Sequence, residues 1–320
     1  MPLSSFSGVI PPEQSTQIIQ EAIIQSAALQ LGSRVPMGSN VTQMPVPSVF
    51  PVASWVSSSG TGRKPYTNVG LVNKTMTAEE VAAVIAIPDA MIEDSTINLW
   101  NFARPLLSQA IAVALDQAVL FGINAPTTFP TGGVIADAQA ATAGVDAVGT
   151  ANRAMGLVEN QGLAVTGHSA DLGVRAALRG VRATTGELIL GETQWQNYTV
   201  PSLFGLPVNY SSWDASITGG ATPENYLTGA WKYLVMGVRS DIRYDMNPAA
   251  VIADASGVVQ VSGWQDNVTP LKVWARFACA LIHPPTPRVP AGAKPFAKAD
   301  LVASTGGLAA AGSGSHSGRK

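Results

Sequence analysis

The residues with the best local claim to chemistry are His168, Ser169 and Asp171, three types that together form hydrolytic triads. A triad is built from side chains that converge in space, whereas these three lie almost next to one another along the chain. The run is more typical of a helix start, where small polar side chains accept hydrogen bonds from free backbone N–H groups. We therefore expect it to cap a helix that begins near Ala170.

Other polar motifs also have structural explanations. The run Gly60 to Pro65 is the nearest approach to a phosphate loop, but Arg63 and Pro65 stand where that loop needs Gly-Lys followed by Ser or Thr. The acidic pair Glu79-Glu80 falls in an extended run, where adjacent side chains point to opposite faces. The pair Glu93-Asp94 precedes a long helix and is explained by the positive end of its dipole. None of these motifs predicts acid/base catalysis or phosphate binding.

Cysteine and histidine are too few for the familiar zinc motifs. The single cysteine, Cys279, lies in an apolar run and cannot form an internal disulfide, and the only histidines are His168, His283 and His316. A buried thiol is the better interpretation of Cys279. We expect no catalytic residue, no cofactor and no metal, and a chain of 320 residues without a recognisable site favours a structural role.

The composition indicates what the surface meets. Charged residues make up 12% of the chain, about half of the usual 25% or so. Either the surface is rich in uncharged polar residues, or much of it is buried against other copies of the chain, since interface cores are depleted in charge. A net charge of -2 gives no basic field for nucleic acid, and no apolar stretch is long enough to cross a membrane.

The longest helical period runs from about Ile97 to Phe121 and defines a central spine helix. Its apolar face is formed by residues spaced three and four apart, namely Leu107, Ile111, Ala114, Leu115 and Ala118. Ser95 is placed to cap its start and Gly122 to end it. Pro105 either lies in the first turn or kinks a longer helix.

Before the spine, the sequence predicts an N-terminal helix and a long hairpin. The helix spans Pro11 to Leu31, and the proline-rich run after it allows only an extended arm or an edge strand. Two extended runs, Val49 to Val56 and Thr75 to Ile87, flank a polar, glycine-bearing tip at Ser57 to Asn68. A two-stranded ribbon is marginal alone, so a neighbouring subunit is expected to cover it.

After the spine, a loop is expected at Asn124 to Gly149 and then a compact α/β unit. Its predicted elements are helices at Ala151–Asn160 and Ala170–Val181 and extended segments at Leu163–Thr166, Leu188–Leu190 and Val200–Asn209. Extended segments follow at Tyr226–Val238 and Ile242–Met246. Leu271 to Ile282 reads as a strand, with a helix left open. Ala291 to Lys320 is predicted to be a flexible tail.

This order of elements, with several local phrases, resembles the major capsid proteins of tailed bacteriophages with the HK97 fold. The phrases are Leu31 to Pro36, Ile87 to Ser95, Ala114 to Gly122, Leu203 to Val208 and Val235 to Ile242. The likeness covers roughly Ile18 to Val289. The chain departs from the family where Gly229 is followed by Ala230 and Trp231 instead of an acidic residue.

The resemblance implies an α+β HK97-like capsid fold. Its parts would be an N-terminal helical arm (1–40), an extended hairpin loop (41–90), a peripheral domain with the spine helix (91–127), an α/β axial domain (128–231), peripheral return strands (232–290) and the tail (291–320). The hairpin would lie over a neighbouring subunit. Its expected contact residues are Phe50, Trp55, Arg63, Lys64 and Tyr66. Some relatives are covalently crosslinked, for which Lys64 and Asn267 are the candidates.

The implied function is self-assembly into hexamers and pentamers of an icosahedral head around double-stranded DNA, which would be contacted only non-specifically. Scaffolding, portal and decoration proteins are the other expected partners, and the protein would be assembled in the host cytoplasm and remain in the virion. Two alternatives stay open: the shell of an encapsulin-type cellular nanocompartment, and a soluble α/β enzyme with an unrecognised site.

Overall fold

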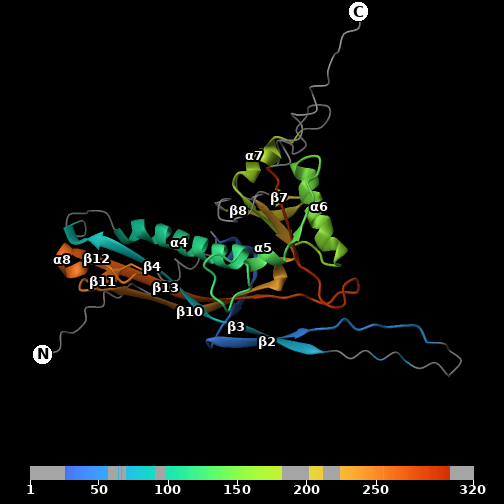
Figure 1. The fold of residues 1–320 in the computed structure, drawn as a ribbon, viewed down its shortest axis with the longest axis horizontal. Helices are drawn as coiled ribbons and strands as arrows, with labels where there is room; N and C mark the ends of the chain where they lie inside the picture. Colours follow the sequence, from blue (N-terminus) through green and yellow to red (C-terminus); the bar gives the residue numbers. More distant parts are fainter. Residues whose placement is uncertain are drawn as a thin grey trace, which may run out of the picture.

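The computed structural model describes residues 26–56, 64, 66, 70–90, 99–181, 202–211, 224–254 and 256–302. The chain forms a four-stranded sheet with a long helix on one face, a six-stranded sheet with its own helices, and a two-stranded ribbon that projects from the first sheet (Figure 1). The predicted Ser95 cap, the strand at Leu188–Leu190 and the first part of the N-terminal helix lie outside the described residues.

The four-stranded sheet has the strand order β1-β10-β13-β4. Its strands are β1 (Ser33–Pro36), β10 (Leu234–Met246), β13 (Val268–Leu281) and β4 (Glu79–Pro88). β1 is parallel to β10, and the other neighbours are antiparallel. Alternation along β13 sends Leu271, Val273 and Phe277 into the core beneath the long helix, so the strand interpretation of this run is confirmed.

The long helix, α4 (Leu99–Phe121), is the predicted spine. Leu107, Ile111 and Leu115 are each at most 3% exposed and belong to the core shared with the four-stranded sheet. Pro105 lies inside the helix. The helix ends at Gly122, which adopts φ 69°, and the N–H of Ile123 donates to the carbonyl of Gln117, as in a glycine-terminated helix.

The short helix α2 (Ala27–Leu31) is tied to the spine by a buried carboxylate. Asp116, on α4, accepts hydrogen bonds from Ser26 Oγ at 2.6 Å and from the backbone N–H groups of Ala27 at 2.8 Å and Ala28 at 3.1 Å. These donors lie at the start of α2, where a negative charge is favoured. Burial nevertheless raises the pKa of Asp116 to about 6, against the opposing effect of these hydrogen bonds.

The six-stranded sheet has the order β5-β14-β9-β6-β8-β7. Its strands are β5 (Gln139–Ala140), β14 (Phe296–Ala299), β9 (Tyr226–Gly229), β6 (Gly167–Asp171), β8 (Leu206–Ser211) and β7 (Ser202–Leu203). The accompanying helices are α5 (Gly133–Asp137), α6 (Ala147–Asn160), α7 (Val174–Arg179) and the 3-10 turn η3 (Trp231–Tyr233). Figure 1 shows α6 and α7 beside β7 and β8, away from the spine.

Two small elements complete the fold. The ribbon pairs β2 (Val41–Pro47) with β3 (Leu71–Thr77) in antiparallel register. A second hairpin, β11 (Val251–Ala253) with β12 (Val259–Ser262), leads into the short helix α8 (Gly263–Asp266). These two hairpins lie at opposite ends of the four-stranded sheet (Figure 1).

The structure corrects the predicted hairpin. The second limb is two strands: β3 pairs with β2, whereas β4 pairs with β13 and packs its alternate side chains under the spine, so residues 79–88 belong to the four-stranded sheet. The chain passes from the ribbon to the four-stranded sheet at Ala78, whose N–H donates a hydrogen bond to the carbonyl of Asn40. The first limb is also shifted, because the strand is 41–47 and residues 48–56 form none.

The run after the first helix forms β1 at the edge of the main sheet, as one of its two predicted alternatives allowed. Ala27, Ala28 and Leu29, just before it, are fully buried in the main core, so the end of the N-terminal helix packs against the body of the subunit. The prediction of a flexible tail was wrong for residues 291–302, and residues 303–320 lie outside the described residues. β14 lies between β5 and β9 inside the six-stranded sheet, with Phe296 fully buried against Trp231 at 5.1 Å between ring centroids.

The region after the spine needs two further corrections. The expected loop at 124–149 contains α5 and β5, and α6 already begins at Ala147. The predicted extended segment and helix at 163–181 are shifted: the strand is Gly167–Asp171 and the helix is Val174–Arg179. His168 is therefore a sheet residue, while Asp171 accepts a hydrogen bond from the Gly173 N–H just before the helix.

Candidate intersubunit interface

The β2–β3 ribbon is anchored at its base and free beyond it. Met76 is buried, and with Met37 it packs on Ala278 and Ala280, on the face of β13 opposite the spine. From there the ribbon extends outward, and Figure 1 shows it leaving the body of the subunit. The base of the ribbon is therefore positioned by the same strand that forms the core under α4.

Exposed apolar side chains gather on this projecting segment. Of the nineteen large hydrophobic side chains that are exposed among the described residues, eight lie between residues 41 and 72: Val41, Val49, Val52, Trp55, Val56, Tyr66, Leu71 and Val72. Trp55 is 103% exposed and Tyr66 is 86% exposed. A cluster of this kind is typical of a surface that a partner covers.

The predicted contact residues fall on this segment. Trp55, Lys64 and Tyr66 are exposed, whereas Phe50 is partly buried. Arg63 lies outside the described residues. The structure thus shows three of the five side chains available to a partner, without showing what they touch.

The two candidate crosslinking residues belong to different ends of the molecule. Asn267 is exposed, ends α8 with φ 50°, and accepts a hydrogen bond from the Asp89 N–H through its backbone carbonyl. Lys64 is exposed on the ribbon segment. Because α8 and the ribbon lie at opposite ends of the four-stranded sheet (Figure 1), the fold does not bring these two side chains together within one chain.

A second exposed apolar patch was not predicted from the sequence. Val251, Val258 and Val259 are each more than half exposed on the β11–β12 hairpin, and Trp264 on α8 is 80% exposed. The turn between the strands is ordered by Asp254, whose side chain accepts hydrogen bonds from the N–H groups of Val258 and Ser256. These hydrogen bonds lower the pKa of Asp254, and the one from Val258 has the largest effect. Apolar residues flanking a short polar turn were the available signal.

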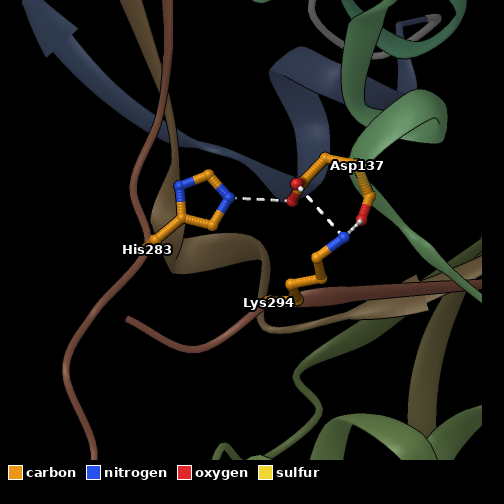
Figure 2. Close-up of polar contacts among 3 residues, drawn as sticks. All are labelled: Asp137, His283 and Lys294. Carbon is orange, nitrogen blue, oxygen red and sulfur yellow. Dashed lines mark hydrogen bonds and ion pairs between the residues drawn. The ribbon is translucent and has the colours of Figure 1, made fainter. Parts of the chain in front are cut away.

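One aspartate, Asp137, contacts both ends of the segment that connects the four-stranded sheet to the six-stranded sheet. Asp137, at the end of α5, lies between His283 and Lys294, which flank the chain segment that crosses from β13 to β14 (Figure 2). His283 Nε2 is 2.8 Å from Asp137 Oδ2, and Lys294 Nζ donates to the Asp137 carbonyl oxygen at 3.1 Å. Asp137 and His283 also line a cleft of about 340 Å³ that reaches Lys74 and Thr75 of the ribbon.

The remaining reactive side chains are held in structural roles. His168 is fully buried; its Nε2 lies 3.2 Å from Leu203 O and its Nδ1 lies 2.8 Å from the Tyr226 hydroxyl. A carbonyl can only accept, so Nε2 carries the proton and Nδ1 is the acceptor. Burial lowers the pKa of His168 to about 4. Burial likewise raises the pKa of the Cys279 thiol to about 12.

Two other kinds of feature are absent from the described part of the chain. Among those residues, no group of three or more His, Cys, Asp or Glu side chains is placed to hold a metal ion. None of the helices in the same ranges combines the length and hydropathy needed to cross a membrane.

Several solved structures with this arrangement come from phages. One from Mycobacterium phage Adephagia superposes with a TM-score of 0.69 at 26% identity, covering 86% of this chain and 90% of that one. One from Microbacterium phage Oxtober96 has a TM-score of 0.69 at 25% identity and covers 94% and 96% of the two chains. The capsid of a native GTA particle shares the fold at 14% identity, with a TM-score of 0.57. The α+β, HK97-like capsid fold is thereby confirmed.

Sequence comparison gives the same answer. The profile of the Phage capsid family matches residues 7–286, and the chain belongs to that family. Among curated relatives, the probable major capsid protein gp17 of Mycobacterium phage L5 is 24% identical over 289 residues, which cover 86% of each chain. The corresponding protein of Mycobacterium phage D29 is 24% identical over 284 residues. The nanocompartment and enzyme alternatives are not favoured.

Proposed function

We propose that this chain is the major capsid protein of a tailed phage and that it assembles with copies of itself into the hexamers and pentamers of an icosahedral shell around double-stranded DNA. The observation that carries the proposal is the pairing of a capsid fold with a projecting ribbon that exposes a concentration of apolar side chains. A subunit with such a segment gains its stability in the assembled state, where the apolar area is covered.

The ribbon segment is the proposed intersubunit contact. Trp55 and Tyr66 are large aromatic side chains without cover in the single chain, and buried aromatic anchors carry much of the energy of protein interfaces. Lys64, Arg63 and Phe50 complete the contact. The exposed hairpin β11–β12 with Trp264 forms a second contact at the other end of the subunit.

A covalent tie between Lys64 and Asn267 of neighbouring subunits is compatible with their positions. In that reaction the Lys64 amine attacks the Asn267 side-chain amide carbon, an isopeptide bond forms and ammonia leaves. Denaturing electrophoresis of mature particles tests it: ladders of linked chains that disappear in Lys64→Arg support the tie. Single chains only, in particles that are otherwise mature, refute it.

Scaffolding, portal and decoration proteins are the proposed partners in the infected cell, where assembly takes place in the host cytoplasm. The packaged DNA is contacted without sequence preference, in keeping with a net charge of -2.

Electron microscopy of the chain produced alone tests the self-assembly. We expect closed particles with hexameric and pentameric clusters on their surface. A preparation that contains only monomers or small closed oligomers at every salt and protein concentration tried would refute the proposal.

A further inference from the structure

The two edges of the β2–β3 ribbon differ, and the difference follows from the register. Ser48 N donates to Gly70 O, and Ala78 N donates to Asn40 O. In an antiparallel pair, positions with mutual hydrogen bonds alternate with positions whose backbone groups point away from the partner strand. Because Val41 pairs with Thr77 and Pro47 with Leu71, the odd-numbered residues of both strands turn their backbone N–H and C=O groups outward.

The outer edge of β2 is closed at most of these positions. Pro45 and Pro47 occupy two of the four outward-facing positions, and proline has no N–H to offer. At Val41 the outward carbonyl already accepts a hydrogen bond from Ser39 Oγ at 2.6 Å. Only Gln43 keeps both groups for a further strand. Prolines at these positions leave the bonds to β3 intact, and they block strand addition on this side.

The outer edge of β3 is open. Three of its four outward-facing positions, Leu71, Asn73 and Thr75, each carry an N–H and a C=O, and no backbone hydrogen bond from another described residue meets them. All three residues are exposed. Leu71 is 68% exposed on one face of the ribbon, and Val72 is 53% exposed on the other, so a strand laid along this edge meets an apolar side chain on each face.

We propose that the β3 edge receives an extended segment of a second copy of this chain, which adds as a third strand to the ribbon. This inference rests on the proposed function, because it describes how one of the shell contacts is made. The occupant is a second copy since the chain belongs to a family of self-assembling shell subunits, and since the free edge is continuous with the exposed apolar segment already assigned to the intersubunit contact. Main-chain hydrogen bonds supply the binding, and the two apolar side chains fix the placement.

Amide hydrogen exchange tests the strand addition directly. The outward amides of Leu71, Asn73 and Thr75 are compared between unassembled subunits and particles that contain this chain alone. The amides of Val72 and Lys74, which face β2, serve as internal controls. We expect the outward amides to exchange fast in subunits and to slow by at least about tenfold in particles. Particles in which these amides exchange as fast as in subunits overturn the strand addition and leave the proposed function standing. Failure of the chain to form any particle refutes the proposed function, and the inference with it.

A pair of variants at one position gives an independent test. Asn73→Pro removes the outward N–H while keeping the bonds to β2, as Pro45 does on the opposite strand. Asn73→Ala removes the same side chain but keeps the N–H. We expect both variants to unfold at the same denaturant concentration as the wild type, and the proline variant alone to need a several-fold higher protein concentration for assembly. Equal assembly of the two variants overturns the proposal. If Asn73→Pro does not fold, the exchange measurement on the wild type decides.

Discussion

His168 makes the six-stranded sheet sensitive to acid in a way that can be measured. The side chain is fully buried, Nε2 donates to a carbonyl, and Nδ1 lies 2.8 Å from the Tyr226 hydroxyl and 2.9 Å from the Thr228 hydroxyl, so a second ring proton would place a positive charge among neutral groups, away from water. Burial lowers its pKa from 6.5 to about 4. A pKa that is lower in the folded chain than in the unfolded one means that the unfolded state binds the proton more tightly. Stability is therefore fully present above pH 6.5 and falls as the pH drops toward 4.

The size of the loss follows from the shift. A difference of 2.5 pKa units, at about 1.4 kcal/mol for each unit, corresponds to about 3.5 kcal/mol in full. About 3 kcal/mol of this is lost between pH 7 and pH 4, because His168 in the folded chain is only half protonated at pH 4. Asp116 acts in the opposite direction, because burial raises its pKa from 3.8 to about 6, and it contributes roughly 2 kcal/mol of added stability over the same pH range. The wild-type chain should thus lose only about 1 kcal/mol from these two groups combined, since the two effects largely offset each other.

The substitution His168→Gln separates them. Glutamine can still donate to Leu203 O but does not titrate, so the variant should lose stability at pH 7 through the missing acceptor for Tyr226, by about 1 kcal/mol. Between pH 7 and pH 4 its free energy of unfolding should change by about 3 kcal/mol more favourably than that of the wild type. Urea titrations of unassembled subunits at the two pH values give this double difference. If both proteins respond to pH by the same amount, His168 is not a buried neutral group.

Two further predictions concern the cores. Ile111→Ala should lower the free energy of unfolding by about 2 to 5 kcal/mol, because it removes buried apolar surface and leaves a cavity. Val113→Ala, at a position 41% exposed on the same helix, should cost less than about 0.5 kcal/mol. Equal costs in denaturant titrations would mean that the face of α4 with Ile111 is not the buried one. Ending the chain at Pro295 removes β14 and should abolish cooperative unfolding of the six-stranded sheet. A chain that ends at Val302 keeps the strand and should melt like the full chain. Indistinguishable thermal unfolding of the two truncated chains would show that β14 is dispensable.

The sequence predicted best the elements whose pattern is set by one local environment. The spine helix has apolar residues at helical spacing and a glycine at its end, and the structure places both as expected, with Ile111 buried and Gly122 in the left-handed region. β13 alternates because one of its faces lies under that helix, so its period of two residues was visible without knowledge of its neighbours.

The failures share a non-local cause. The second limb of the hairpin reads as one extended run, and only the pairing of its two halves with different sheets separates β3 from β4 at Ala78. β14 is a short alanine-rich strand near a Gly/Ala/Ser-rich end, and its order comes from β5 and β9 on either side. Phe296 and Leu301, both fully buried, were the large apolar residues that could have signalled it. His168 was misplaced because its surroundings are supplied by Leu203 and Tyr226, both far along the chain.

The intersubunit contact was predictable as a segment but not in its details. The polar, glycine-bearing tip between two extended runs indicated a projecting hairpin. Trp55 and Tyr66 are exposed in the single chain, as expected of residues that a partner covers. Which strand edge is open could not be predicted, because it depends on the register between β2 and β3 and on Pro45 and Pro47 falling at outward-facing positions.

The central claim is that the ribbon holds subunits together and contributes little to the fold of one subunit. The most direct test replaces residues 49–69 by a short turn between β2 and β3, which leaves the buried base at Met76 intact, and follows the variant by circular dichroism and by analytical sedimentation. We expect a native spectrum, an unchanged unfolding midpoint and no shell-sized particles. Shells of normal yield and stability from this shortened chain would show that the ribbon does not hold subunits together.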